Sequence, residues 1–239
     1  MKKRLSAAGL GLRLTAAPVA AVILAASLLQ IWSFYRTEYL WSGELGNAGF
    51  EWILDEEGVG LWGKLSFIGI LVVTVGRTCS ARNRASYTLR RLRIREGEVT
   101  FLWAVIFSGY FLVSWAVQLG LVLWMYVQYA AQVGTDGIGL FAASYRSAYF
   151  HLLLPLEETL GYLRNILICV GWGGMGAMMA RYMRHGGKPF MAVALILVTG
   201  FFLPGEMASM STDIVLCVAI CAMVIVHILI NRGWGRDED

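Results

Sequence analysis

Charged side chains are scarce in this sequence of 239 residues. They make up 15% of it, against about a quarter of an average soluble domain. Apolar residues make up 58%. A soluble fold of this size would have too few polar side chains to cover its surface, whereas a lipid bilayer removes that need. The composition therefore argues against an ordinary soluble domain and predicts an integral membrane protein.

Cysteine is also rare, with four residues. Cys169, Cys217 and Cys221 fall inside apolar runs, and Cys79 stands beside Arg77 in a segment that we expect in the cytoplasm. We therefore expect no disulfide framework. Cys217 and Cys221 are four residues apart and share a helix face, but two ligands do not complete a zinc site. Simple packing is the favoured role of these thiols.

The three histidines come from three different regions of the chain. We expect His151 outside the cell, His185 in the cytoplasm and His227 near the inner end of the last span. The bilayer would then keep them from sharing a metal or a haem, and we expect no cofactor. His227 could be a proton or ligand site, although a hydrogen bond to a neighbouring helix is the favoured role.

No catalytic motif is apparent in the sequence, so we do not expect an enzyme. Glu157 and Glu158 resemble the paired glutamates of some membrane proteases, but Arg164 lies too far along for the Glu-Glu-x-x-x-Arg pattern. A phosphate loop ending at Lys188 would need a glycine in place of Tyr182 and a hydroxyl in place of Pro189. Any ATP-driven work would therefore need another subunit.

Long apolar runs predict an all-α, polytopic protein with a single transmembrane domain over residues 1–239. The first run holds 22 uncharged residues, which favours an uncleaved span over a signal peptide. The second needs Lys64 to snorkel, and the 37 uncharged residues of the third suit one long helix. Six spans are expected, at residues 14–35, 58–76, 100–130, 160–180, 189–204 and 214–231.

The charges orient these spans. With both termini in the cytoplasm, 16 of the 20 basic residues face the cytoplasm and 11 of the 16 acidic residues face outward. The positive-inside rule therefore favours six spans over seven. Outside, residues 141–155 predict a helix on the membrane surface that ends at Pro155. The glycines of the fourth span, such as Gly173, would let helices approach closely.

The loop between Arg77 and Glu98 carries seven arginines, more than orientation alone requires. The separation of basic and acidic residues into different loops argues against a nucleic-acid partner. On a helical projection the apolar residues of this loop lie on two sides, which suits a short helix held between the membrane domain and a protein partner. An alternating strand over residues 91–95, or a basic loop resting on anionic lipid, are the alternatives.

Residues 86–103 read Ser-Tyr-Thr-Leu-Arg-Arg-Leu-Arg-Ile-Arg-Glu-Gly-Glu-Val-Thr-Phe-Leu-Trp. This segment resembles the one that enters the third span in permease subunits of six-span bacterial ABC exporters. The resemblance implies a multi-pass subunit of a bacterial cell membrane that forms a translocation path with a second permease subunit and couples to a separate ABC ATPase subunit. It also implies that the ATPase contacts Tyr87, Leu89, Arg90, Arg91, Leu92, Arg93, Ile94 and Arg95. The alternative function is a membrane anchor or regulatory module of another complex.

Overall fold

The protein is described by a computed structural model that covers residues 2–41, 49–55, 58–79, 94–133, 138–156 and 159–184, together with Val193, residues 214–215 and residues 217–222. All the regular secondary structure in these residues is helical. The helices are α1 (Lys2–Trp41), α2 (Phe50–Asp55), α3 (Val59–Cys79), α5 (Glu96–Val133), α6 (Ile138–Arg146), α7 (Ala148–Leu153) and α8 (Thr159–Arg184).

Four stretches of helix are long and apolar enough to cross a membrane, namely Lys3–Arg36, Phe50–Cys79, Glu96–Ala131 and Thr159–Arg184. They coincide with the first four predicted spans, so the chain is an all-α protein with four candidate membrane-spanning helices. The third predicted run is indeed one unbroken helix, α5. The predicted spans 189–204 and 214–231 lie outside the described residues, except for Val193 and the pieces between 214 and 222.

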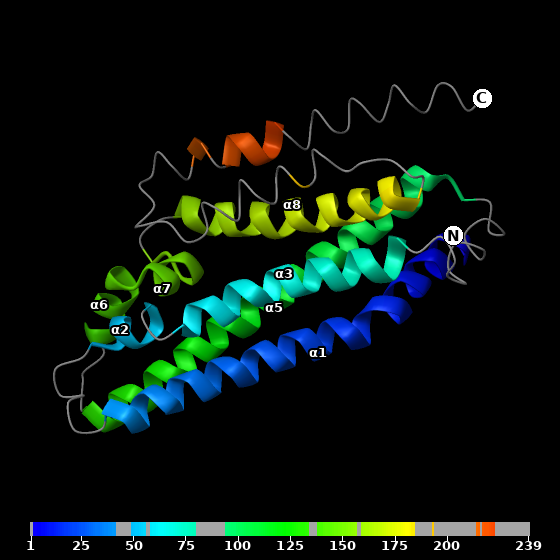
Figure 1. Cartoon of the computed structure of the whole chain (residues 1–239). Coiled ribbons are helices and arrows are strands. Elements are labelled where there is room, and N and C mark those ends of the chain that lie inside the picture. Colours follow the sequence, from blue (N-terminus) through cyan, green and yellow to red (C-terminus); the bar gives the residue numbers. More distant parts are fainter. Residues whose placement is uncertain are drawn as a thin grey trace.

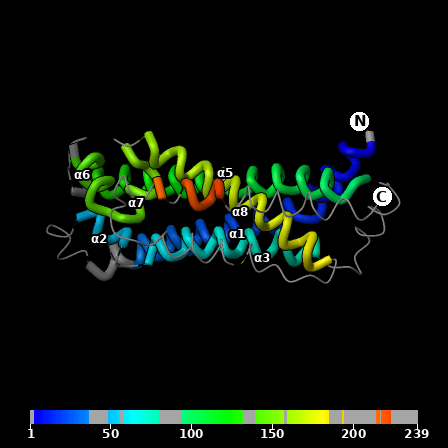
Figure 2. The backbone as a smooth tube through the Cα atoms, turned by 90° about the horizontal axis from the view of Figure 1, so that it is seen from above, coloured from blue at the N-terminus to red at the C-terminus, as the bar shows by residue number. Residues whose placement is uncertain are grey.

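The long helices run roughly along one axis, with α3 and α5 between α1 and α8 (Figure 1). The short helices α2, α6 and α7 gather at one end, which we call the capped end (Figures 1 and 2). The opposite end, which we call the basic end, is formed by the start of α1, the end of α3, the start of α5 and the end of α8. The segment that joins α3 to α5 therefore leaves and re-enters the bundle at the basic end.

The outer faces of the long helices remain apolar. On α1, Leu24, Leu28 and Trp32 are spaced four residues apart, and each is more than half exposed. On α3, Leu61, Leu65, Ile68 and Val72 form a similar stripe. Continuous exposed apolar surface of this kind is unfavourable in water but suits contact with lipid. The pattern supports insertion of the bundle in a membrane.

Glycines bring α8 close to α5, as the sequence predicts. Gly173 packs directly against the backbone of Ser108, where a Cβ would overlap that residue. A Cβ at Gly176 would lie 3.1 Å from the Leu71 side chain and 3.5 Å from the Phe107 ring, so it would fit only tightly. Close contact between small residues is a main source of helix association in membranes. Ile220, within the predicted sixth span, is buried in a cluster with Leu71 and Trp172.

The surface segment 141–155 differs from the single helix that the sequence predicts. It forms two short helices, α6 and α7, which are separated at Ser147. The Ser147 hydroxyl accepts a hydrogen bond from the backbone N–H of Phe150 at 3.1 Å, so it caps the start of α7 and breaks the run. The helix ends at Leu153, close to the predicted end at Pro155, because a proline disfavours a helical backbone in the residue before it.

Candidate functional site

A chain of buried polar groups joins four helices near the capped end. The amide Nε2 of Gln30 on α1 donates to the carbonyl of Val59 at 3.1 Å and to the hydroxyl of Tyr149 on α7 at 3.1 Å. The Tyr149 hydroxyl donates in turn to Oε1 of Gln118 on α5 at 2.9 Å. Because the Val59 carbonyl can only accept, it fixes the direction of the whole chain of donors.

The neighbouring helices hold Tyr149 in this position. Asp55, the last residue of α2, accepts hydrogen bonds from the Ser147 hydroxyl and from the backbone N–H groups of Ala148 and Tyr149, at 3.0–3.2 Å. A carboxylate at the start of a helix satisfies donors that the helix leaves unpaired. Gly63 on α3 makes room for the hydroxyl, since a Cβ there would overlap it. Burial raises the pKa of Tyr149, which therefore stays a neutral donor.

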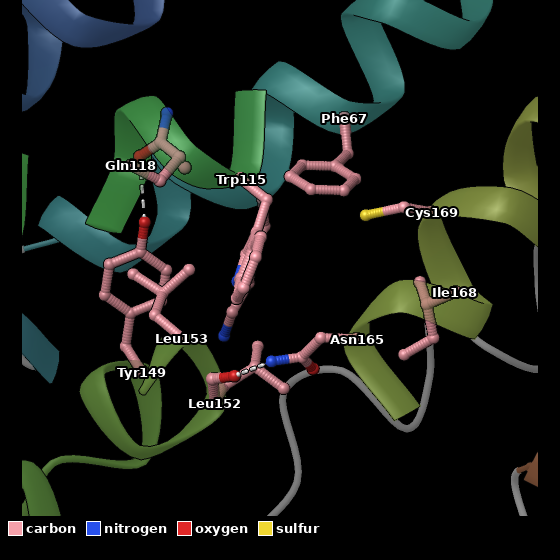
Figure 3. Close-up of a pocket in the computed structure, with 11 residues that line it drawn as sticks. Phe67, Trp115, Gln118, Tyr149, Leu152, Leu153, Asn165, Ile168 and Cys169 are labelled. Atoms are coloured by element: carbon pink, nitrogen blue, oxygen red, sulfur yellow. Dashed lines mark hydrogen bonds between the residues drawn. The ribbon is translucent and has the colours of Figure 1, made fainter. Parts of the chain in front are cut away.

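A cavity opens beside this polar chain, between α3, α5, α7 and α8 (Figure 3). Its volume is about 470 Å³ when the space at its open mouth is counted. Most of its wall is apolar and includes Phe67, Trp115, Leu152, Leu153, Ile168 and Cys169. Figure 3 shows the rings of Phe67 and Trp115 on one side and Ile168 and Cys169 on the other. An apolar cleft with a few polar groups is the usual form of a small-molecule site.

Four polar side chains also line the cavity. Tyr149 and Gln118 are bonded to each other, and Asn165 donates to the backbone carbonyl of Leu152 at 2.7 Å. The fourth is Lys64, a half-buried cation on α3. The sequence indicated only that Lys64 would snorkel to the membrane surface. The structure places it at the edge of the cavity.

A second cluster of polar contacts lies at the basic end. Glu96 and Glu98 occupy the first turn of α5, where acidic groups complement the helix dipole. Glu98 pairs with Arg4 of α1 at 2.9 Å, and Glu96 pairs with Arg184 of α8 at 3.2 Å. The Arg184 guanidinium also lies 4.7 Å from the centre of the Trp103 ring. The base of α5 is therefore tied to both α1 and α8.

The predicted partner contact falls largely beyond what the structure describes. Tyr87, Leu89, Arg90, Arg91, Leu92 and Arg93 lie outside the described residues. Ile94 and Arg95 precede α5 and do not belong to a helix. Ile94 packs against the cluster that contains Trp103, and the Arg95 carbonyl accepts the first hydrogen bonds of α5 from Glu98 and Val99. These two residues therefore attach the last part of the loop to the first turn of α5.

The other residues that the sequence singled out do not assemble into a site in the described part of the chain. His151 lies on α7 and makes an edge contact with the ring of Tyr145. His185, His227, Glu157 and Glu158 are outside the described residues. Cys79, Cys169 and Cys221 are free thiols. The residues that the structure describes include no group of three or more metal-binding side chains.

Sequence reasoning missed the polar chain at the capped end. Gln30 is the only amide side chain in the first apolar run, and Gln118 is the first of three in the third run. Both are almost fully buried. Polar residues inside a span are costly and mark functional or packing sites, so their presence was a usable signal. Tyr149 carried no such signal, because it lies in a segment predicted to rest on the membrane surface.

Comparisons with protein-family models, with curated proteins and with solved structures found no match to this chain. The likeness of residues 86–103 to permease subunits therefore remains a hypothesis, and function has to be argued from the geometry.

Proposed function

We propose that the chain is the membrane-spanning subunit of an ATP-driven transporter and that a separate ATPase subunit docks on its loop at residues 86–95. The observation that carries this proposal is the course of α5. It begins at Glu96, directly after the loop, and continues without a break to Val133 at the capped end. On the way it contributes Trp115 and Gln118 to the cavity. One continuous helix thus connects the loop to the cavity.

The contacts at the basic end suit transmission of force. The Arg184 side chain is only 6% exposed, and it bonds Glu96 while it covers the face of Trp103. Only the arginine of this pair is buried, since Glu96 is 38% exposed, but the pair and the ring contact together should make α5 and α8 move together when the loop is displaced. The Arg4–Glu98 pair is exposed at both partners, and exposed pairs contribute little. At this end the ion pairs therefore hold α8 to α5 more firmly than they hold α1, which is also joined to α5 by a hydrogen bond from the Trp103 indole to the Ala7 carbonyl at 3.3 Å.

The proposed transport mechanism follows from this difference. ATP-driven closure of two ATPase subunits would push the loop, and α5 and α8 would shift as one unit relative to α1. The cavity between α3, α5, α7 and α8 would then change shape. A second permease subunit, identical or different, completes the path across the membrane. We place the basic end in the cytoplasm, because the positive-inside rule assigns its arginines to that side.

Co-purification with the ATPase tests the proposal. Leu89→Asp puts a charge into the predicted packing surface, and Arg90→Glu combined with Arg91→Glu reverses the charge beside it. Both variants should reduce recovery of the ATPase, because a truncated buried charge pair costs about 2–5 kcal/mol at an interface. Arg36→Glu, near the far end of α1, is the matched control and should retain the partner. Normal recovery with both loop variants, after normal membrane insertion, would refute the docking role.

A further inference from the structure

The cavity near the capped end contains polar groups that find no partner in the described part of the chain, and all of them are donors. Lys64 makes no ion pair or hydrogen bond with any described residue. The indole Nε1 of Trp115 and the amide Nε2 of Gln118 are buried without an acceptor among the same residues. The acceptors in the cavity wall are engaged, since Gln118 Oε1 accepts from Tyr149 and the Leu152 carbonyl accepts from Asn165.

Asp55, the carboxylate that attracts the Lys64 ammonium group, already accepts hydrogen bonds from other groups. Asp55 contributes to the electrostatic environment of Lys64, but it already accepts three hydrogen bonds at the start of α7. A half-buried ammonium group without a bonded partner is unfavourable, and an anion beside it would reduce that cost. One cation and neutral N–H donors match a single negative charge on a group that can accept hydrogen bonds, such as a carboxylate.

The surroundings of Lys64 indicate that this anion carries an apolar chain. Leu61, Leu65 and Ile68 flank Lys64 on α3, and each is between 40% and 55% exposed. This stripe would meet lipid chains if α3 spans the membrane. Inside the cavity, Phe67, Leu152 and Ile168 continue the apolar surface. A molecule with a charged head and a hydrocarbon tail could therefore reach the site from the membrane and keep its tail in apolar contact throughout.

We infer that the cavity binds the carboxylate end of a single-chain amphiphile, with Lys64 and the Trp115 indole as the donors to its head. Phe67, Leu152, Ile168 and Cys169 would contact the first part of the tail. The inference concerns binding alone and does not depend on the proposed docking of an ATPase, so the two can fail independently.

Tryptophan fluorescence of the full-length protein in phosphatidylcholine nanodiscs tests the inference. The probe is 2-bromododecanoate, whose bromine lies next to the carboxylate and quenches a tryptophan that it contacts. We expect saturable quenching above the partitioning background, and its loss in Trp115→Phe. Lys64→Met should weaken the saturable phase about tenfold or more, because a hydrogen bond to a charged group is worth about one to two powers of ten in affinity. Lys64→Arg should retain it, and Arg13→Met, which removes an exposed cation elsewhere, should not change it.

Competition on the unaltered protein makes the test independent of how well the variants fold. Dodecanoate should displace the bromo acid, whereas dodecylamine and methyl dodecanoate should not. Displacement by dodecylamine would show that charge is not recognised, and full displacement by acetate would show a small-anion site without tail recognition. Either result, or unchanged quenching in a folded Lys64→Met protein, would overturn the inference.

Discussion

The hydroxyl of Tyr149 donates a hydrogen bond to Oε1 of Gln118 at 2.9 Å, and this bond connects a short helix at the capped end to the middle of a membrane-spanning helix. The same hydroxyl accepts from Gln30. One phenol therefore links α1, α5 and α7. Its position depends on Asp55, which holds the start of α7, and on Gly63, which leaves room for the ring. The capped end is thus built around Tyr149.

Tyr149→Phe should destabilise the protein, because it leaves Oε1 of Gln118 buried without its donor. An unsatisfied buried polar group costs about 1–3 kcal/mol. We expect a lower melting temperature in detergent, followed by circular dichroism. Tyr145→Phe is the matched control, since Tyr145 is about half exposed, and it should melt like the unaltered protein. Equal melting temperatures for all three proteins would show that the polar chain does not stabilise the capped end.

Arg184→Gln should destabilise the basic end more than Arg4→Gln does. Arg184 is nearly buried, bonds the partly exposed Glu96 and covers Trp103, so the loss should amount to about 1–2 kcal/mol, chiefly from the contact with the ring. Arg4 is exposed, and its pair with Glu98 should matter little to the melting temperature. High salt should weaken the Arg4 pair selectively, because exposed charges are screened. A larger effect from Arg4→Gln would contradict the different attachment of α1 and α8 to α5.

Gly173→Ala and Gly174→Ala form a matched pair of test variants on α8. A Cβ at position 173 would overlap the backbone of Ser108, whereas one at position 174 would meet nothing within 4 Å. Gly173→Ala should therefore cost about 1–3 kcal/mol as the helices are forced apart. Gly174→Ala should be neutral or slightly stabilising. Similar melting temperatures for the two variants would argue against close packing of α5 on α8.

Cysteine labelling tests the predicted six-span topology, which extends beyond the described residues. In a background without the four native cysteines, a membrane-impermeant maleimide added to intact cells should modify Leu45→Cys and should not modify Gly186→Cys. Disruption of the membrane should expose both. Modification of Gly186→Cys in intact cells would place the segment after α8 outside and would overturn the six-span arrangement.

Sequence patterns predicted the long helices well, because an uninterrupted apolar run of about 20 residues has few alternatives in a membrane. The run from Val99 to Thr135 was long enough to predict one helix, and α5 is one helix. The close approach at Gly173 was also foreseeable, since small residues favour tight helix contacts. These predictions depend only on neighbours along the chain.

The capped end could not be predicted in the same way, because its contacts join residues far apart in the sequence. Asp55 caps a helix that begins more than 90 residues later, and nothing near it in the sequence indicates that partner. The Ser147 hydroxyl, which caps α7 at Phe150, also donates to Asp55, and the pattern of residues 141–155 alone does not reveal that partner. The sequence placed Lys64 at the membrane surface. It could not reveal the cavity beside Lys64, because most of that cavity is formed by α5, α7 and α8, which are distant in the sequence.

The central claim is that the loop at residues 86–95 contacts an ATPase, and photocrosslinking in living cells tests it most directly. A benzophenone amino acid at position 89 should give an adduct whose partner, identified by mass spectrometry, carries a Walker A phosphate loop. The same amino acid at position 138, on α6 at the opposite end of the bundle, should not give that adduct. Crosslinks from position 89 to lipid alone, with the protein correctly inserted, would contradict the proposed function.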